Sequence, residues 1–182
     1  MTWTLDSSHS SIDFSVRHMM ITTVRGSFKT FSAVVDFQPD ALHLSNVELT
    51  IQADSINTRD DKRDGHLKSP DFFDVATYPT IVFKSTGVEI SDKSKGKLNG
   101  TLTIHGVTKP VVLEVEHVGT MKSPFGMTAA GFNGSTTINR KDFGLGWNVA
   151  LEAGGWLVSD EIRISFEIEL TQVPETAAAA TA

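Results

Sequence analysis

The side chains with the greatest capacity for chemistry are six histidines, and their spacing follows no known catalytic or metal-binding pattern. They occupy positions 9, 18, 43, 66, 105 and 117. The chain has no cysteine, and it contains no H-E-x-x-H motif, no G-x-S-x-G motif and no glycine-rich phosphate loop. Strands can still bring metal ligands together from distant positions. The spacing by itself therefore predicts no metal site, no cofactor and no catalytic residue.

One stretch, residues 55–79, does not fit a strand or a turn between strands. Thr58, followed by an aspartate three residues later, resembles a capping box and predicts a helix start. A Ser-Pro pair at 69–70 gives a second helix-start signal, which leads into the adjacent Phe72 and Phe73. We therefore expect a charged helical insertion that carries two neighbouring aromatic side chains.

Most of the remaining chain alternates apolar and polar residues, as half-buried β-strands do. The eight alternating runs are residues 10–18, 26–37, 44–54, 80–90, 98–104, 111–117, 127–138 and 161–171. In the fourth run the phase slips near Gly87, where we expect a β-bulge. A second irregular or helical insertion, residues 139–160, precedes the last strand.

Eight alternating strands joined mostly by short turns predict an all-β, antiparallel fold in a single domain. The runs are longer than the usual 5–6 residues or so, and long tilted strands favour a tall eight-stranded barrel. The helical insertion lies between strands 3 and 4 of this barrel. We place the domain at residues 1–173 and expect residues 174–182, which are mostly alanine, to be a disordered tail.

The inward faces of these strands mix large side chains with small ones, including Ala33, Gly100 and Gly134. Such a mixture would leave a narrow lumen walled by hydrocarbon, and an elongated apolar ligand would fill it. Alternatively, facing strands interdigitate around the small residues and nothing binds. His18 and His117 fall on the same apolar faces and are interpreted as core histidines. The pattern alone leaves both kinds of barrel open.

The composition of the chain argues against some classes of binding partner. The chain has 16 basic and 22 acidic residues, and no basic run interleaves with aromatic residues, which argues against nucleic acid. No run of about 18 apolar residues occurs, so we expect no transmembrane segment. The first residues lack the features of a signal peptide; we therefore expect a cytoplasmic protein, or a periplasmic or secreted one if a leader was removed. A homodimer through an exposed strand edge or the insertions is compatible with the sequence.

Several short motifs are spread from about Trp3 to Thr171. They are His9-Ser10, VRGSF at 24–28, SINT at 55–58, RDGHL at 63–67, DFFDV at 71–75, Tyr78-Pro79, GTLTIHGVTKP at 100–110 and NRKDFGL at 139–145. Together they resemble the YceI-like family. This resemblance implies a lipocalin-like, eight-stranded antiparallel barrel that binds a polyisoprenoid lipid, such as an isoprenoid quinone or a prenyl phosphate, in its lumen.

The function expected from this resemblance is binding, storage or transport of an elongated apolar lipid, without catalysis. The residues predicted to line the lumen are Phe14, Val16, Phe31, Ile51, Phe72, Phe73, Ile81, Phe83, Leu102, Phe132, Phe143 and Trp147. The residues predicted to meet a head group at one mouth are Arg25, Arg63, His66 and Arg140. Two other functions stay open: an enzyme acting on a small apolar or isoprenoid substrate, and a stress-response or interaction module with a filled barrel. For His66 and Arg140 the alternative is a solvated surface with local ion pairs.

Overall fold

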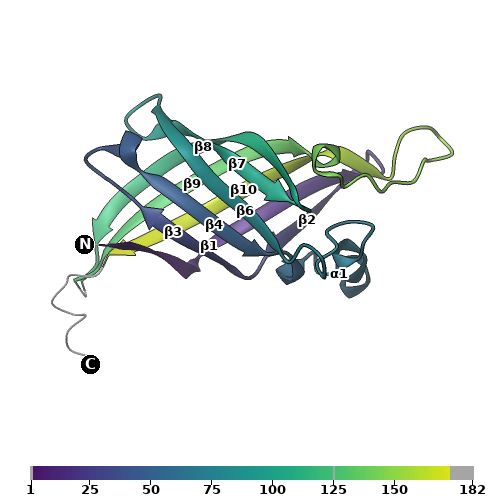
Figure 1. The fold of residues 1–182 in the computed structure, drawn as a ribbon, viewed down its shortest axis with the longest axis horizontal. Coiled ribbons are helices and arrows are strands. Elements are labelled where there is room, and N and C mark those ends of the chain that lie inside the picture. The colour runs from purple at the N-terminus through teal and green to yellow at the C-terminus, as the bar shows by residue number, and fades with distance from the viewer. Residues whose placement is uncertain (1, 125, 173–182) are drawn as a thin grey trace.

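The computed structural model describes residues 2–124 and 126–172, and strands dominate it (Figure 1). The strands are β1 (Trp3–His18), β2 (Thr22–Phe28), β3 (Phe31–Asp36), β4 (Asn46–Gln52), β5 (Ile56–Asn57), β6 (Thr80–Ile90), β7 (Lys95–Ile104), β8 (Val107–Lys122), β9 (Thr128–Asn139) and β10 (Val158–Gln172). The helices are α1 (Asp61–Lys68) and the short 3₁₀ helices η1 (Leu42–Leu44), η2 (Ala53–Ser55) and η3 (Arg140–Phe143). No helix in this part of the chain is both long and apolar enough to cross a membrane.

All of these strands belong to one antiparallel sheet, in the order β3-β4-β6-β7-β8-β9-β10-β1-β2-β5. Toward one edge β2 pairs with β1, and at the other edge β3 pairs with β4. Only Lys29 and Thr30 separate β2 from β3, so one bent strand connects both sides and curls the sheet around a common interior (Figure 1). With β2 and β3 counted as one strand and the two-residue β5 set aside, the predicted eight-stranded antiparallel fold is confirmed.

The predicted alternation determines which side chains face the interior. The predicted bulge is confirmed by a register shift between Ser85 and Gly87 in the pairing of β6 with β7. Beyond the bulge, Val88 and Ile90 face the interior again. The extra residue therefore restores the apolar phase of β6.

The first strand, β1, begins at Trp3 and so extends the first alternating run toward the N-terminus. Its pairing with β10 shifts in register between Asp6 and Ser11. Within this bulge the Ser8 backbone N–H donates to Oδ1 of Asp6 over 2.9 Å. Local hydrogen bonds accommodate the extra residues of the bulge. The strand therefore continues on both sides of a segment in which apolar and polar residues do not alternate.

The helical insertion is present, but only one of its two predicted helix starts is real. Asp60 and not Thr58 caps α1, because the Asp60 carboxylate accepts a hydrogen bond from the Arg63 backbone N–H over 3.0 Å. The Ser-Pro pair at 69–70 starts no helix. The chain turns back there instead, and the backbone N–H of Phe73 donates to the carbonyl of Leu67 over 3.0 Å. This turn presents Phe72 and Phe73 to the barrel interior.

Candidate functional site

The curled sheet encloses a cavity of about 720 Å³. The cavity reaches from the β1–β2 turn and α1 at one end of the barrel to the β6–β7 turn at the opposite end (Figure 1). The inward faces of the strands supply a wall that is almost entirely hydrocarbon, and charged side chains enter it mainly near the two ends. Its volume lies in the upper part of the range of about 300–1,000 Å³ that is usual for small-molecule sites.

Phenylalanine rings lie over glycines on this wall. A Cβ atom placed on Gly134 would overlap the Phe166 ring of the neighbouring strand, and one placed on Gly100 would lie 2.5 Å from the Phe83 ring. Gly26 has the same relation to Phe14. Because each ring occupies space that a side chain would otherwise take, the rings lie along the wall, and the centre of the lumen stays open.

The structure brings most of the predicted lumen residues to the cavity. The residues on its wall are Phe14, Val16, Ile51, Phe72, Phe73, Ile81, Phe83, Leu102, Phe132 and Trp147. The strand residues among them follow from alternation, and Phe72 and Phe73 reach the wall through the turn after α1. Trp147 arrives from the loop between β9 and β10.

Two predicted lumen residues lie elsewhere. Phe143 ends η3 and is only 2% exposed, because its ring is buried in the hydrophobic core together with Ile138 and Leu145. Phe31 begins β3 directly after the bend from β2, and its partly buried ring packs against the same core. Neither side chain is part of the cavity wall.

Some lining residues were not predicted. Val24 and Phe28 line the cavity from β2, in phase with Gly26. The alternation of the second run could not have found Val24, because the inward phase changes at the bend: Val24 and Phe28 face the cavity from β2, whereas Ala33 and Val35 face it from β3. Asp60 and Lys62 also line the cavity, at the α1 end. Periodicity could not predict Asp60 and Lys62, because the residue at which α1 begins determines the direction of their side chains.

A buried polar network fixes α1 at its end of the lumen. The Asp64 carboxylate, 6% exposed, accepts hydrogen bonds from the Thr58 backbone N–H over 2.9 Å and from the Thr58 hydroxyl over 2.5 Å. Arg63 donates from Nε to the Thr58 hydroxyl over 2.8 Å and from Nη2 to the Thr58 carbonyl over 2.9 Å. Its Nη1 lies 3.9 Å from Asp60, beside the cavity. Arg63 therefore stabilises the insertion and also places positive charge at the rim.

His66, in the last turn of α1, joins the two insertions. Its Nε2 lies 2.9 Å from Oδ2 of Asp71. Its ring stands edge-on to the Trp147 ring at a centroid distance of 4.7 Å and to the Phe72 ring at 5.1 Å. Since His66, Phe72 and Trp147 all line the cavity, the insertions touch across this end of the lumen.

Arg140 lies on the cavity wall but has its donors engaged by the backbone. It is 2% exposed and donates from Nη1 to the carbonyls of Leu145 over 2.6 Å and Trp147 over 2.8 Å, and from Nε to the carbonyl of Ser159 over 3.0 Å. Burial lowers the pKa of Arg140, and the nearby Asp160 opposes this effect. Arg140 therefore holds the loop that carries Trp147, and few of its donors remain for a ligand.

Arg25 does not reach the lumen. It lies in β2 between Val24 and Gly26, and it is exposed on the outer face. Because successive side chains of a strand point to opposite faces, the inward position of Val24 turns Arg25 outward.

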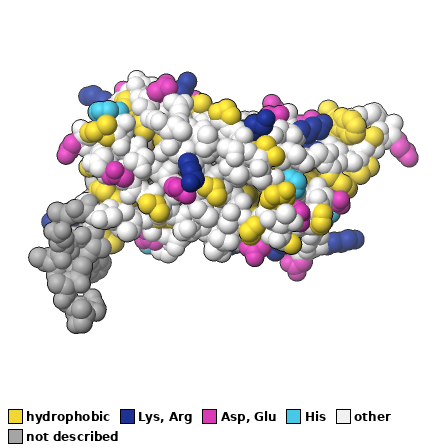
Figure 2. Space-filling view, viewed as in Figure 1, with side chains coloured by type: hydrophobic (Ala, Val, Ile, Leu, Met, Phe, Trp, Pro, Cys, Tyr) yellow, Lys and Arg dark blue, Asp and Glu magenta, His cyan; other side chains and the backbone are white. Residues whose placement is uncertain are grey.

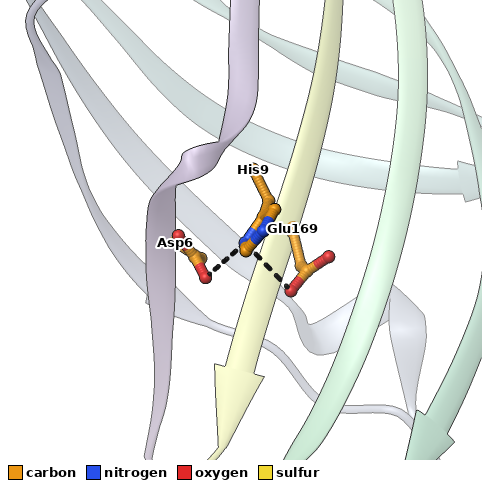
Figure 3. A group of neighbouring side chains, drawn as sticks. All are labelled: Asp6, His9 and Glu169. Atoms are coloured by element: carbon orange, nitrogen blue, oxygen red, sulfur yellow. Dashed lines mark hydrogen bonds and ion pairs between the residues drawn. The ribbon is translucent and has the colours of Figure 1, made fainter.

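A second polar group, formed by Asp6, His9 and Glu169, lies at the bulge of β1 (Figure 3). Nδ1 of His9 lies 3.0 Å from Asp6 and 3.9 Å from Glu169. Hydrogen bonds from Ser8 and then His9 lower the pKa of Asp6 to about 2, and the hydrogen bond with Asp6 raises the pKa of His9. One ligand atom from each residue lies within 4.8 Å of the others, a spacing that could hold a metal ion. The same three side chains also form ion pairs, which hold the bulge of β1 against β10.

Comparison with known proteins agrees with this geometry. Residues 3–170 match the YceI-like domain. A UPF0312 protein of Staphylococcus aureus (strain bovine RF122 / ET3-1) is 35% identical over 170 residues, which cover 93% of this chain and 96% of that protein. BcnA of Burkholderia cenocepacia has a TM-score of 0.79 at 27% identity, covering 91% of this chain and 98% of that chain. A polyisoprenoid binding domain from Saccharophagus degradans has a TM-score of 0.65 at 17% identity, covering 96% of this chain and 99% of that chain. The resemblance predicted from the motifs is confirmed, and the chain belongs to the YceI-like family.

Proposed function

We propose that this protein binds an elongated apolar lipid in its lumen, and that the lipid is a polyisoprenoid such as an isoprenoid quinone or a prenyl phosphate. The observation that carries the proposal is the cavity of about 720 Å³ with a hydrocarbon wall. An apolar cavity of this size gains stability when apolar groups fill it. Membership of the YceI-like family, and a fold shared with a polyisoprenoid binding domain, support this class of lipid. Storage or transport of the lipid would follow from its binding.

Burial of the tail would supply the affinity. Each methylene moved out of water contributes about 0.8 kcal/mol, or roughly 4 kcal/mol for a five-carbon isoprene unit. Association and ordering cost roughly 4–15 kcal/mol. About four buried units would therefore offset even the larger cost. Affinity should rise with the number of isoprene units and depend less on the head group.

Of the four residues predicted to meet a head group, Arg63 and His66 remain in the proposal. Both line the cavity at the α1 end, where Lys62 adds a second cation. A quinone carbonyl or a phosphate oxygen could accept hydrogen bonds there. Arg25 points outward, and Arg140 donates to backbone carbonyls.

The decisive experiment is to purify the protein without detergent and analyse an organic-solvent extract by mass spectrometry. The expected result is a near-stoichiometric prenyl lipid. The extracted protein should then take up quinones with long prenyl tails and fail to take up those with one or two isoprene units. A protein that is isolated empty and does not take up long-chain quinones would contradict the proposal.

One observation favours an enzyme as the second candidate. The hydrogen-bonded pair of His66 and Asp71 lies beside the lumen, and a carboxylate that orients an imidazole is a common acid–base arrangement. An enzyme would turn over an isoprenoid substrate at a rate that depends on pH. Both His66→Ala and Asp71→Asn should abolish that pH dependence. Binding without turnover in the unmodified protein would favour a binding role over a catalytic one.

A further inference from the structure

Large apolar side chains are exposed together at the end of the barrel that carries the two insertions. They come from the β1–β2 turn and from the loop between β9 and β10, and they are Met19, Met20, Ile21, Val149 and Trp156. Ile21 is 72% exposed, Met20 is 68% exposed and Trp156 is 53% exposed. Figure 2 shows hydrophobic side chains gathered at the end where Figure 1 places this loop. We call these five residues the apolar tip.

Backbone hydrogen bonds join the two segments into one surface. The Met19 N–H donates to the Leu157 carbonyl over 2.8 Å, and the Leu157 N–H donates to the Val149 carbonyl over 2.9 Å. A Cβ atom on Gly155 would lie 2.7 Å from the sulfur of Met20, so that side chain rests directly on the loop. The two segments of the tip therefore form one continuous surface.

The turn that exposes these side chains is strained. Met19 and Met20 have φ angles of 50° and 60°, a left-handed conformation that favours glycine or asparagine. Arg17 braces it, donating from Nη2 to the Met20 carbonyl and from Nη1 to the Thr23 hydroxyl, each over 3.3 Å. Strain of this kind persists where the surrounding structure holds it, and it is concentrated at functional sites. A turn of small polar residues would satisfy the fold at lower cost.

We propose that the apolar tip docks on the surface of a lipid bilayer and opens the lumen toward it. The tip adjoins the cavity, since Arg17, His18 and Leu157 line the cavity wall and neighbour the tip in the chain. Tryptophan beside aliphatic side chains suits the boundary between head groups and acyl chains. The choice of a bilayer rests on the proposed function, because an apolar lipid cargo resides in a membrane.

Charges around the tip indicate that apolar insertion, and not attraction to anionic lipid, would drive docking. Lys141, whose Nζ lies 5.8 Å from the centroid of the Trp156 ring, is paired with Asp160 over 2.9 Å. Arg17 is engaged by the turn, and Glu152 and Glu161 add negative charge to the loop and to β10. Docking should therefore occur on neutral phosphatidylcholine and change little with salt.

Flotation with phosphatidylcholine vesicles tests this proposal. The unmodified protein should float with the vesicles, and the variant Met20→Ser, Ile21→Ser, Trp156→Ser should lose roughly tenfold or more of the bound fraction. The control is Val34→Ser with Val118→Ser, which removes two well-exposed apolar side chains from the outer wall of the barrel. In a second measurement, brominated lipid should quench the fluorescence of the unmodified protein, and Trp156→Phe should remove most of that quenching.

The lipid content and oligomeric state of each variant separate the outcomes. An unmodified protein that retains its prenyl lipid yet does not float would overturn the docking proposal and leave the proposed function intact. Equal flotation of the tip variant and the control, or flotation confined to anionic vesicles, would also overturn it. A dimer that dissociates only in the tip variant would assign the tip to a second copy of the chain. Flotation that depends on the tip, in a protein that never holds lipid, would support docking and refute the proposed function.

Discussion

Gly134 gives a direct test of how the lumen is kept open. A Cβ atom there would overlap the Phe166 ring and would lie 2.7 Å from the backbone carbonyl oxygen of Glu114 in β8. The pairing of β8 with β9 restrains that carbonyl, so in Gly134→Ala the ring must turn toward the lumen and the strands must shift. Overpacking of this kind costs about 1–3 kcal/mol. We expect Gly134→Ala to lower the free energy of unfolding by this amount and to reduce the lipid bound per protein.

Two other glycines provide graded controls. A Cβ atom on Gly131, in the same strand, would meet only Val118, at an ordinary 3.7 Å. Gly131→Ala should therefore change the unfolding free energy by no more than about 0.5 kcal/mol. The atoms nearest to a Cβ atom on Gly26 would be side-chain atoms of Phe14 and Thr58, and the Phe14 ring can move more easily than backbone. Gly26→Ala should have an intermediate effect.

The assay is urea unfolding of lipid-free protein, because bound lipid would add its own stabilisation. Adding Phe166→Leu to Gly134→Ala removes the ring atoms that the new Cβ would meet, and it should recover part of the lost stability. If Gly134→Ala is as stable as Gly131→Ala and binds as much lipid, the Phe166 ring does not lie over the glycine, and this account of the open lumen is refuted.

Three further changes test other parts of the structure. Replacing Phe72 and Phe73 together by alanine should cost roughly 3–5 kcal/mol for the buried ring of Phe72 and less for the partly buried ring of Phe73, and a loss of lipid retention larger than the loss of folded protein would place the turn in the binding site. Arg140→Met leaves buried carbonyls unpaired, so urea unfolding should show a loss of at least about 3 kcal/mol. The raised pKa of His9 means that its pair with Asp6 stabilises the fold at low pH and loses this effect as pH rises through that pKa, while the lowered pKa of Asp6 means that the effect is also lost as pH falls toward 2. His9→Ala should therefore lower the melting temperature most between about pH 4 and 6.5, and an equal deficit at pH 8 would contradict this explanation.

Periodicity predicted the barrel because, in a half-buried strand, apolar residues on the inner face alternate with polar residues on the outer face. The inward position of Ile162, Ile164 and Phe166 follows from that rule, and so does the bulge before Gly87. The segments that escaped prediction take their shape from individual hydrogen bonds. The bulge of β1 depends on the bond from Ser8 to Asp6, and the turn after α1 depends on the bond from Phe73 to Leu67.

The individual residues of the candidate site could be predicted better than the contacts between them. His66, Phe72 and Trp147 were each predicted, but their contact joins two insertions about 80 residues apart. No pattern in either insertion specifies that contact. Arg140 was predicted to meet a head group because a cation beside a lumen suits that role. Its carbonyl partners lie in a loop without periodicity, so only the structure shows that its donors are engaged.

The choice between an open and a filled lumen depends on ring orientation, which the residue types on a face do not determine. From the sequence, Gly100 and Gly134 on the inward faces could leave gaps, or they could admit side chains from across the barrel. The structure shows a third arrangement, in which each glycine accepts a phenylalanine ring from its own wall. Interdigitation therefore runs along the sheet and not across the lumen, so the large aromatic side chains do not fill the centre. A residue larger than glycine at any of these positions would turn a ring inward, and the lumen would begin to close.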